Sequence, residues 1–320
     1  MPDITAVKEN QPKVEKSRKE MTKFQWTLHE MKRTWVGYVM VAPFFVWFVL
    51  FTVLPVVLSI LLCFTSFNML QWPKFIFMDN FVRMFTEDDL FMTAFKNTII
   101  FAIATGPTSY ILSFVIAWFI NEIPPKTRSL VTFVFYSPSM AGGVTGIWSM
   151  IFAGDIYGYA NGWLMSLGLI REPILFFSDV NYIFPLVVIC ALWGSLGTSF
   201  LAFIAGLQGV DRHLYEAAAV DGIKNRWQEA WYITLPSMKP MLMFGALLSI
   251  TSGFGFGGLI SALCGTPSTD YCAWTLTHHI SEYMGTRMEY GYSSALSVVL
   301  FLLMVGSNSL VQKFLAKVGQ

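Results

Sequence analysis

One polar segment carries the residues of this chain that are best suited to contact another molecule. Glu216-Ala217-Ala218-Ala219-Val220-Asp221-Gly222 is followed by Ile233-Thr234-Leu235-Pro236, and the segment lies between two long apolar runs. Small alanine side chains beside a charged Glu216 would let the backbone of another protein approach closely. The chemistry predicted for this segment is therefore docking of a protein rather than catalysis.

Local signals predict that the segment forms two helices joined by a turn. Asp211 is a good N-cap, so residues 212–220 should form a helix that Gly222 ends in a left-handed turn. Asn225 with Gln228 three residues later resembles the capping box of a second helix, which Pro236 should end. The alternative is an amphipathic connector lying on lipid, but alanines bury too little apolar area to hold a membrane surface.

Other reactive residue types do not form a recognisable catalytic set. His278 and His279 are adjacent, so their rings point in different directions, and no third ligand lies nearby; we predict no metal site. Cys264 and Cys272 could form a disulfide in an oxidising exterior, although chance placement explains their spacing equally well. No Gly-Lys pair occurs in the chain, so it contains no nucleotide-binding P-loop of the usual form.

The composition predicts an all-α integral membrane protein. Hydrophobic residues make up 55% of the chain and charged residues 13%, which is too little charge to cover the surface of a soluble protein. A membrane-spanning helix needs about 20 apolar residues. Six runs qualify, at roughly 36–65, 96–120, 129–152, 182–205, 239–262 and 290–312.

The distribution of basic residues predicts the orientation of these spans. Most Lys and Arg residues lie in segments 1–34, 121–128, 206–240 and 313–320, so the positive-inside rule places both termini in the cytoplasm. These basic residues are topological anchors, and we expect no nucleic-acid partner. Residues 1–35 are predicted to be a cytoplasmic tail with an interfacial helix near its end, a pattern that the mere start of the first span explains about as well.

The interiors of the last five runs contain no Asp, Glu, Lys, Arg or His. Proton-coupled carriers usually need ionisable groups at membrane depth, so their absence argues against that class. A sodium site built from backbone carbonyls would escape this test, and a secondary transporter of a neutral solute stays an alternative. If transport is powered by ATP, the energy must come from another chain that docks at the polar segment.

The polar segment resembles the EAA loop of permease subunits of binding-protein-dependent ABC importers. The similarity lies in Glu216-Ala217-Ala218, Gly222 and Ile233-x-Leu235-Pro236. Further residues are similar to the sugar-importing branch, of the maltose/glycerol-phosphate type: Trp148, Gly158, Asn161, Trp193, Leu207-Gln208 and Gly291-Tyr292-x-x-Ala295-x-Ser297. The resemblance covers the chain from about residue 36, so 36–320 is expected to form a type I importer permease domain, with 206–238 as its cytoplasmic coupling loop.

This resemblance implies a multi-pass protein of a bacterial inner or plasma membrane that is not itself an enzyme. It also implies a second homologous permease, two ABC ATPase subunits that use ATP and Mg, and an extracytoplasmic substrate-binding protein, with no cofactor bound by this chain. The residues expected to contact the ATPase are Glu216, Ala217, Ala218, Asp221, Gly222, Leu235 and Pro236.

The expected solute is a sugar or oligosaccharide, with a sugar phosphate or polyol left open. Sugars favour aromatic faces combined with uncharged hydrogen-bonding groups, and each residue chosen on this ground could equally be an ordinary packing residue. Glycines at 253, 255, 257 and 258 favour a polar route in the fifth run. The residues expected to line the solute route are Asn97, Trp148, Trp193, Ser252, Phe254 and Phe256.

Overall fold

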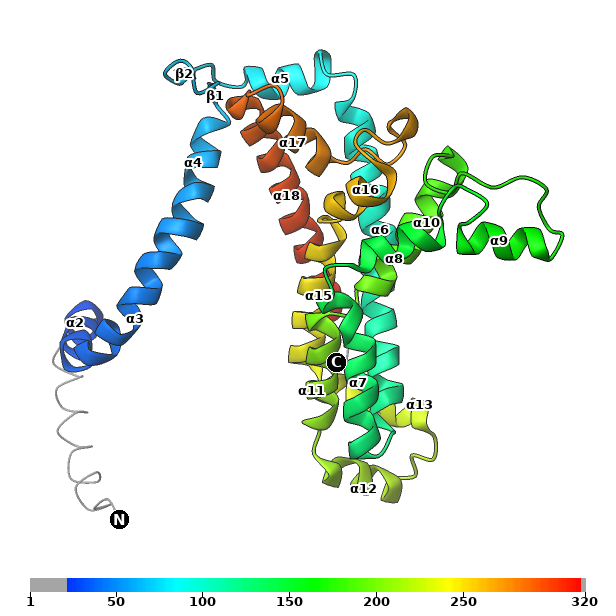
Figure 1. The fold of residues 1–320 in the computed structure, drawn as a ribbon. Helices are drawn as coiled ribbons and strands as arrows, with labels where there is room; N and C mark the ends of the chain where they lie inside the picture. Colours follow the sequence, from blue (N-terminus) through cyan, green and yellow to red (C-terminus); the bar gives the residue numbers. More distant parts are fainter. Residues whose placement is uncertain (1–21, 318–320) are drawn as a thin grey trace. The chain divides into compact units, whose positions relative to one another are not determined.

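The computed structural model describes residues 22–317 (Figure 1). By its internal contacts the chain divides into two units, residues 1–58 and residues 59–320. Each unit is described by itself.

The described residues of the first unit are helical. Helix α2 (Lys23–Arg33) precedes α3 (Trp35–Phe48), the π-helical turn η1 (Val49–Val53) and α4 (Leu54–Leu62), which runs past the boundary of the unit. The last three elements join into one apolar helix, Trp35–Leu62, which is long and apolar enough to cross a membrane.

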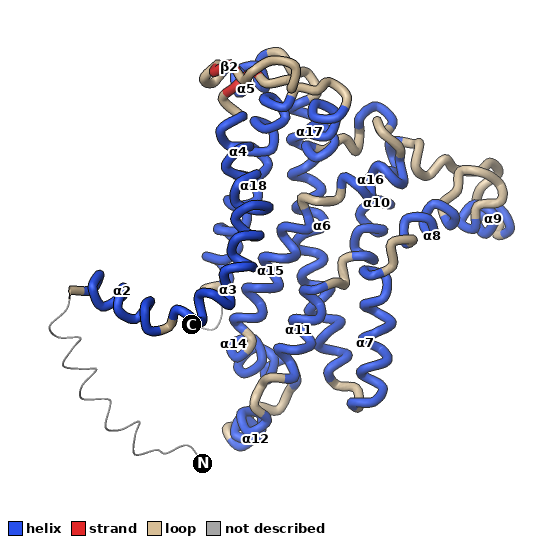
Figure 2. Tube along the Cα trace, turned by 60° about the vertical axis from the view of Figure 1, so that its left-hand side comes forward, coloured by secondary structure: helices blue, strands red, loops and turns tan. Residues whose placement is uncertain are grey.

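The second unit is built mainly from helices, with one small hairpin (Figures 1 and 2). Strands β1 (Thr65–Ser66) and β2 (Lys74–Phe75) pair antiparallel, which is the one difference from an all-α prediction. The elements that follow are α5 (Asp79–Thr86), α6 (Phe91–Asn121), α7 (Pro125–Met140), α8 (Val144–Ile151), α9 (Tyr159–Ser166), α10 (Val180–Gly194), α11 (Thr198–Gln208), α12 (Arg212–Val220), α13 (Arg226–Glu229), η2 (Ala230–Thr234), α14 (Leu235–Ser237), α15 (Lys239–Gly253), α16 (Gly257–Cys264), η3 (Thr269–Tyr271), α17 (Leu276–Gly285) and α18 (Tyr290–Leu315).

The structure supports three to six membrane spans in the described residues. Three helices are long and apolar enough to cross a membrane on their own: Trp35–Leu62, Phe91–Asn121 and Tyr290–Leu315. Three further pairs qualify only when the two helices of each pair count as one bent span: Pro125–Met140 with Thr145–Ile151, Val180–Gly194 with Thr198–Gln208, and Arg226–Ser237 with Lys239–Gly253.

The fifth run departs most from its predicted extent of 239–262. Helix α15 stops at Gly253, and α16 starts at Gly257 after a short break. The last turn tightens, because the amides of Phe254 and Gly255 donate to carbonyls three residues back, those of Thr251 and Ser252. Glycine favours such a stop because it loses more conformational entropy in a helix than other residues do.

Helices α6, α11 and α15 form the packed centre of the second unit. Phe203 of α11 is fully buried and lies edge-to-face against Tyr110 and Phe114 of α6, at ring-centre distances of 5.4 and 5.8 Å. On the other side, a Cβ added to Gly245 of α15 would lie 2.3 Å from the Phe203 ring, so the ring fills the space that the glycine leaves open. This packing holds α11 and α15, which precede and follow the polar loop, against α6.

The segments 66–95, 153–181 and 263–289, which lie between the predicted spans, contain regular structure. They contain α5, α9 and α17, in addition to the hairpin. Buried amides fix two of these loops. Asn161 donates to the carbonyls of Ala153 and Ile174 at 3.0 Å each, and Asn80 donates to those of Cys63 and Thr65 at 2.8 and 3.0 Å. One side-chain amide that satisfies several backbone carbonyls can hold such a loop in one conformation.

Candidate functional site

Helix α12 is held by the caps that the sequence predicts. The Asp211 side chain accepts from the amide of His213 at 3.0 Å, which satisfies one free N–H of the first turn. At the other end Gly222 has φ +92°, and the amide of Ile223 donates back to the Ala218 carbonyl at 3.0 Å. The predicted start and left-handed end of this helix are confirmed.

The side chains of α12 divide between two faces. Ala218 is buried against the rest of the unit, whereas Ala217 and Ala219 are exposed, because successive helical residues are rotated by about 100°. The three alanines therefore do not form one smooth surface as predicted. Glu216 lies outward with 63% of its side chain exposed, 3.5 Å from His213 and 3.9 Å from Arg212. An exposed carboxylate with such loose partners is free to meet another molecule.

The second helix of the loop starts and ends near the predicted residues. Asn225 caps α13 by accepting from the amide of Trp227 at 2.8 Å. Gln228 accepts from the amide of Lys224 instead of that of Asn225, so the reciprocal capping box is not formed. The continuous helix Arg226–Ser237 ends one residue after Pro236, so the predicted end near this proline is confirmed. The chain bends by 82° where α14 meets α15, at Met238.

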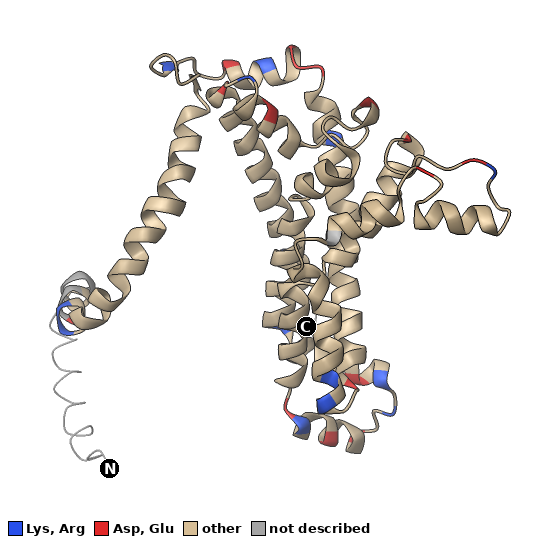
Figure 3. Ribbon diagram, in the orientation of Figure 1, with Lys and Arg blue, Asp and Glu red and all other residues tan. Residues whose placement is uncertain are grey.

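The charges of the second unit gather at its two ends (Figure 3). Helices α12 and α13 carry one group, the loops around α5 and α17 carry the other, and a few further charges lie on the loops at α9. The helices between them are almost free of acidic and basic side chains in the described residues. This pattern fits a protein whose middle crosses hydrocarbon and whose ends meet water.

Two of the six residues predicted to line a solute route lie together. The rings of Trp148 on α8 and Trp193 on α10 are 6.0 Å apart and nearly perpendicular, and Phe152 stacks on Trp148 at 5.7 Å. Trp193 is largely exposed. The indole N–H of Trp148 is buried and has no hydrogen-bond partner in the described chain. This pair offers an aromatic face and an unused donor, which is a combination suited to a hydroxylated ligand.

The other four predicted residues do not join this pair. Asn97 donates to the carbonyls of Tyr271 and Trp274 at 3.1 and 3.0 Å, which holds the segment before α17. Ser252 donates to the Leu248 carbonyl within its own helix. Phe254 is buried, and Phe256 packs in a separate apolar cluster. These four side chains therefore make packing contacts or hydrogen bonds to the backbone within the chain.

A polar cavity of about 620 Å³ lies beside the break between α15 and α16, and sequence reasoning missed most of it. The sequence analysis indicated only the glycines of its lining. The other lining residues come from α16, α17 and the segment between them. Its lining combines hydroxyl groups, aromatic rings and glycines: Gly255, Gly257, Gly258, Ser261, Thr266, Pro267, Tyr271, Trp274, Thr277, His278, Ser281, Glu282 and Thr286.

The adjacent histidines have separate structural partners. His278 contacts Thr275 through Nδ1 at 2.8 Å and Ser261 through Nε2 at 3.0 Å. His279 accepts from the Trp274 indole N–H at 3.2 Å, so its Nε2 carries the proton that it directs to Asp88 at 2.7 Å. Cys264 and Cys272 are free thiols, so the disulfide considered above is not present.

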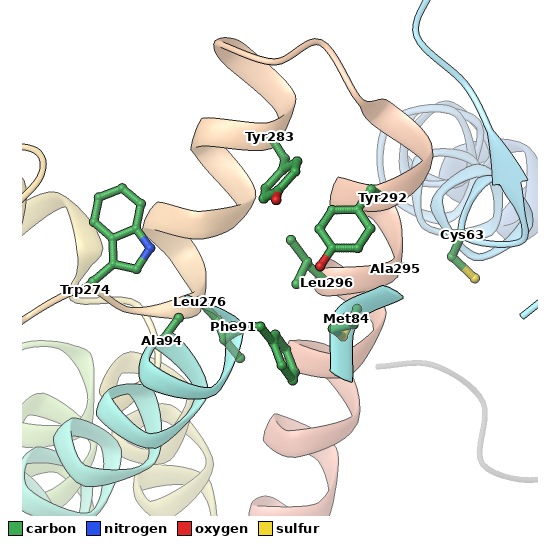
Figure 4. Close-up of a cluster of buried hydrophobic side chains, with 10 residues drawn as sticks. All are labelled: Cys63, Met84, Phe91, Ala94, Trp274, Leu276, Tyr283, Tyr292, Ala295 and Leu296. Atoms are coloured by element: carbon green, nitrogen blue, oxygen red, sulfur yellow. The ribbon is translucent and has the colours of Figure 1, made fainter. Parts of the chain in front are cut away.

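Asp88 ties together the loop before α6 and helices α17 and α18. Its side chain is only 6% exposed. Besides His279, it accepts from Tyr292 at 2.6 Å and Tyr283 at 3.3 Å, two tyrosines that lie close together in Figure 4. Burial alone would raise the pKa of Asp88, but the hydrogen bonds from His279 and Tyr292 outweigh it and lower that pKa to about 2.

Replacing Asp88 by asparagine is expected to lower the free energy of unfolding by about 2–3 kcal/mol, since charged hydrogen bonds are lost and buried donors remain. The folded-state pKa lies below the ordinary value of 3.8, so this carboxylate stabilises the fold above pH 3.8 and loses that effect as the pH falls toward about 2. Thermal unfolding across this pH range should therefore depend less on pH in Asp88→Asn. An equal pH dependence in both proteins would contradict the assignment.

Comparison with known proteins shows that the chain is similar to membrane components of transport systems. Residues 98–320 match the family described as binding-protein-dependent transport system inner membrane component. The chain is 32% identical over 281 residues to a probable ABC transporter permease protein, YesP, of Bacillus subtilis (strain 168), covering 86% of this chain and 88% of the relative. It is 28% identical to the lactose transport system permease protein LacF of Rhizobium radiobacter, covering 88% and 94%.

A solved structure shares the fold. The chain is similar to a chain of a bacterial ABC transporter involved in the import of the acidic polysaccharide alginate, with a TM-score of 0.73 and 23% identity. The similarity covers 90% of this chain and 98% of the other. The predicted helical permease fold is confirmed at this level.

Proposed function

Because this chain belongs to the family of binding-protein-dependent transport system inner membrane components, we propose that it moves a sugar or oligosaccharide into the cell. The family makes it a multi-pass, non-catalytic permease component of the inner membrane. We further propose that the energy enters through α12 and the helix that follows it.

The observation that carries this proposal is the geometry of α12. A capped helix ends at a left-handed glycine and presents Glu216 to solvent, at the end of the second unit that is opposite to α5 and α17 (Figure 1). Among the exposed residues of α12 only Leu214 and Val220 are large and apolar, which is little area for resting on lipid. An ATPase subunit would contact Glu216, Ala217, Asp221 and Gly222 directly, while Ala218, Leu235 and Pro236 would shape the surface from within.

The proposed assembly contains a second homologous permease, two ATPase subunits that use ATP and Mg, and an extracytoplasmic substrate-binding protein. A related transporter has been solved in complex with an alginate pentasaccharide-bound periplasmic protein. In the proposed topology six spans cross the membrane, with both termini and α12 in the cytoplasm. The basic residues near α12 support this orientation through the positive-inside rule.

The relatives favour a carbohydrate as the solute. Their names include lactose and arabinooligosaccharide transport system permeases. We propose that the Trp148–Trp193 pair and the cavity beside the α15–α16 break form parts of the route, because both offer aromatic faces and uncharged polar groups. The interiors of the last five apolar runs contain no Lys or Arg that could bind a phosphate, so a neutral sugar is preferred over a sugar phosphate.

Uptake driven by different energy sources tests this function against the alternative of an ion-coupled transporter. The assembled importer is reconstituted in proteoliposomes with the binding protein and labelled oligosaccharides. We expect uptake only with ATP present on the α12 side and no uptake by this chain alone. Uptake by the chain alone, driven by a sodium or proton gradient without ATP, would overturn the proposal.

Replacing Trp193 by alanine is expected to raise the solute concentration for half-maximal uptake by up to about tenfold, which corresponds to about 1.4 kcal/mol. The reason is the loss of an exposed aromatic face that a sugar ring can cover. Trp163→Ala is the control, because Trp163 is also a largely exposed tryptophan, at 73% against 56% for Trp193, and lies on α9 away from the pair. An equal change in both variants would remove Trp193 from the route.

A further inference from the structure

We propose that four residues, Glu122, Arg226, Trp118 and Trp227, form a latch that carries movement of the coupling loop to the turn between α6 and α7. This inference rests on the proposed function of α12 as the docking helix. It assigns the four residues a positioning role, and nothing in it requires them to contact the ATPase or the solute.

The ion pair of the latch joins segments that are far apart in the sequence. Arg226, the first residue of α13, donates through Nη2 to Glu122 at 3.0 Å, across 104 positions of the chain. Its Nη1 donates to Glu229 at 2.7 Å, one turn along its own helix. The planar guanidinium thus bridges two carboxylates in fixed directions, which a lysine could not do in the same way.

Aromatic packing reinforces the pair. The rings of Trp118 on α6 and Trp227 on α13 lie 5.0 Å apart with an interplanar angle of 60°. Trp118 is one helical turn before Glu122, and Trp227 directly follows Arg226. Both contacts therefore connect the same end of α6 to the same turn of α13, and the two contacts together limit rotation as well as separation.

The turn between α6 and α7, which contains Glu122, is held by further hydrogen bonds. Arg128 of α7 donates to the carbonyls of Asn121 and Ile123, at 2.7 Å and 3.1 Å through Nη2. Asn121 is the last residue of α6 and Ile123 lies just beyond it, where carbonyl groups have no partner within the helix. Displacement of Glu122 is therefore passed on to both α6 and α7 and not absorbed by a loose loop.

A second set of contacts links the latch to α12. The hydroxyl groups of Tyr215 on α12 and Thr234 on η2 are 2.9 Å apart, and Ile223 is bonded back to Ala218. A polar cavity of about 480 Å³ lies between these elements, lined in part by Glu122, Arg128, Tyr215 and Arg226. Besides the chain connection of α12 to α11, the second helix of the loop therefore provides a link from α12 to the end of α6.

The exposure of the ion pair distinguishes a role in coupling from a role in folding stability. The side chains of Arg226 and Glu122 are 64% and 44% exposed, and ion pairs of this kind add little to folding stability. Removing the pair should leave the fold intact. Its effect should appear in how movement at α12 is converted to movement of the spans, because a coupling contact matters only when one side is displaced.

The ratio of ATP hydrolysed to solute imported tests the latch in the assembled importer. In Glu122→Gln the carboxylate charge on the α6–α7 turn is lost, and we expect the ratio to rise at least about threefold. Glu229→Gln is the matched control, because it removes the other partner of Arg226 but leaves the contact with Glu122. We expect this control to keep the ratio of the unmodified importer, and Glu122→Asp to restore part of the coupling.

Two further tests, a charge exchange and Glu216→Lys, distinguish failure of the latch from failure of the docking helix. A charge exchange, Glu122→Arg with Arg226→Glu in the Glu229→Gln background, should recover coupling if the cross-segment pair is what matters. An unchanged ratio in Glu122→Gln would overturn the latch. If Glu216→Lys uncouples the same importer, only the latch fails; if Glu216→Lys also has no effect, the docking role of α12 fails with it.

Discussion

Exchanging Glu216 for lysine is expected to reduce solute uptake at least about 100-fold, equivalent to about 2.7 kcal/mol of lost docking free energy. The carboxylate lies on the open side of α12 and has only loose partners within the chain. Placing the opposite charge at a complementary interface both removes an attraction and adds a repulsion, and losses of about 2–5 kcal/mol are typical when one partner of such a pair is lost. Uptake into proteoliposomes with the complete importer measures the effect.

A control variant separates docking from a general effect of charge. Gln228→Lys adds a positive charge at an exposed position of the second helix in the same loop. We expect it to change uptake less than about twofold and both variants to unfold at the temperature of the unmodified protein. If Glu216→Lys supports normal uptake, α12 is not the docking helix.

Gly291→Ala is expected to lower the free energy of unfolding by about 3 kcal/mol, at the upper end of typical overpacking costs. A Cβ at this position would lie 2.0 Å from the Thr65 carbonyl oxygen and 3.0 Å from the Phe67 amide nitrogen. Both are backbone atoms, so no side-chain rotation relieves the clash. The Gly291 amide also donates to the Phe67 carbonyl at 3.1 Å, so separation of the two segments breaks a hydrogen bond.

The same helix offers a matched control. Gly306 lies further along α18, and a Cβ added there meets no atom within 4 Å. Gly306→Ala should leave the melting temperature unchanged or raise it slightly, since alanine is the better helix former. Equal melting temperatures for Gly291→Ala and Gly306→Ala would mean that the hairpin and α18 do not approach as closely as described.

The parts of the fold that sequence reasoning found depend on local chemistry. Asp211, Asn225 and Gly222 determine helix ends through bonds to backbone groups within a few residues, so their types and spacing were sufficient. The apolar runs were equally visible, because a helix in hydrocarbon must be apolar over its whole length. The glycines at 253, 255, 257 and 258 were visible in the sequence, but the close approach of Gly253 to Ala102 and Gly106 of α6 was not.

The parts that sequence reasoning missed depend on distant partners. Asp88 and His279 are 191 positions apart, so nothing in the sequence indicates that one neutralises the burial cost of the other. Helix α17 was overlooked for the same reason, because its histidines look like a polar loop until Asp88 and Ser261 are placed beside them. The latch between Glu122 and Arg226 also joins residues that only the fold brings together.

The candidate sites also divide into one formed by neighbouring residues and others formed by residues far apart in the sequence. The docking residues of α12 form one continuous stretch, so their types indicated both the helix and its exposed carboxylate. The solute residues come from several helices, and of the six proposed only Trp148 and Trp193 meet as one aromatic pair. A cavity lined by α16 and α17 could not be found from apolar runs alone, because most of its lining residues lie beyond the end of the fifth run.

Cross-linking from α12 tests the central claim most directly. A photoreactive amino acid is placed at the exposed position of Ala217, and the importer is irradiated in its native membrane. We predict a covalent product between this chain and an ATPase subunit, with a yield that changes when ATP is added. Labelling of lipid alone, with no protein product in either condition, would contradict the account.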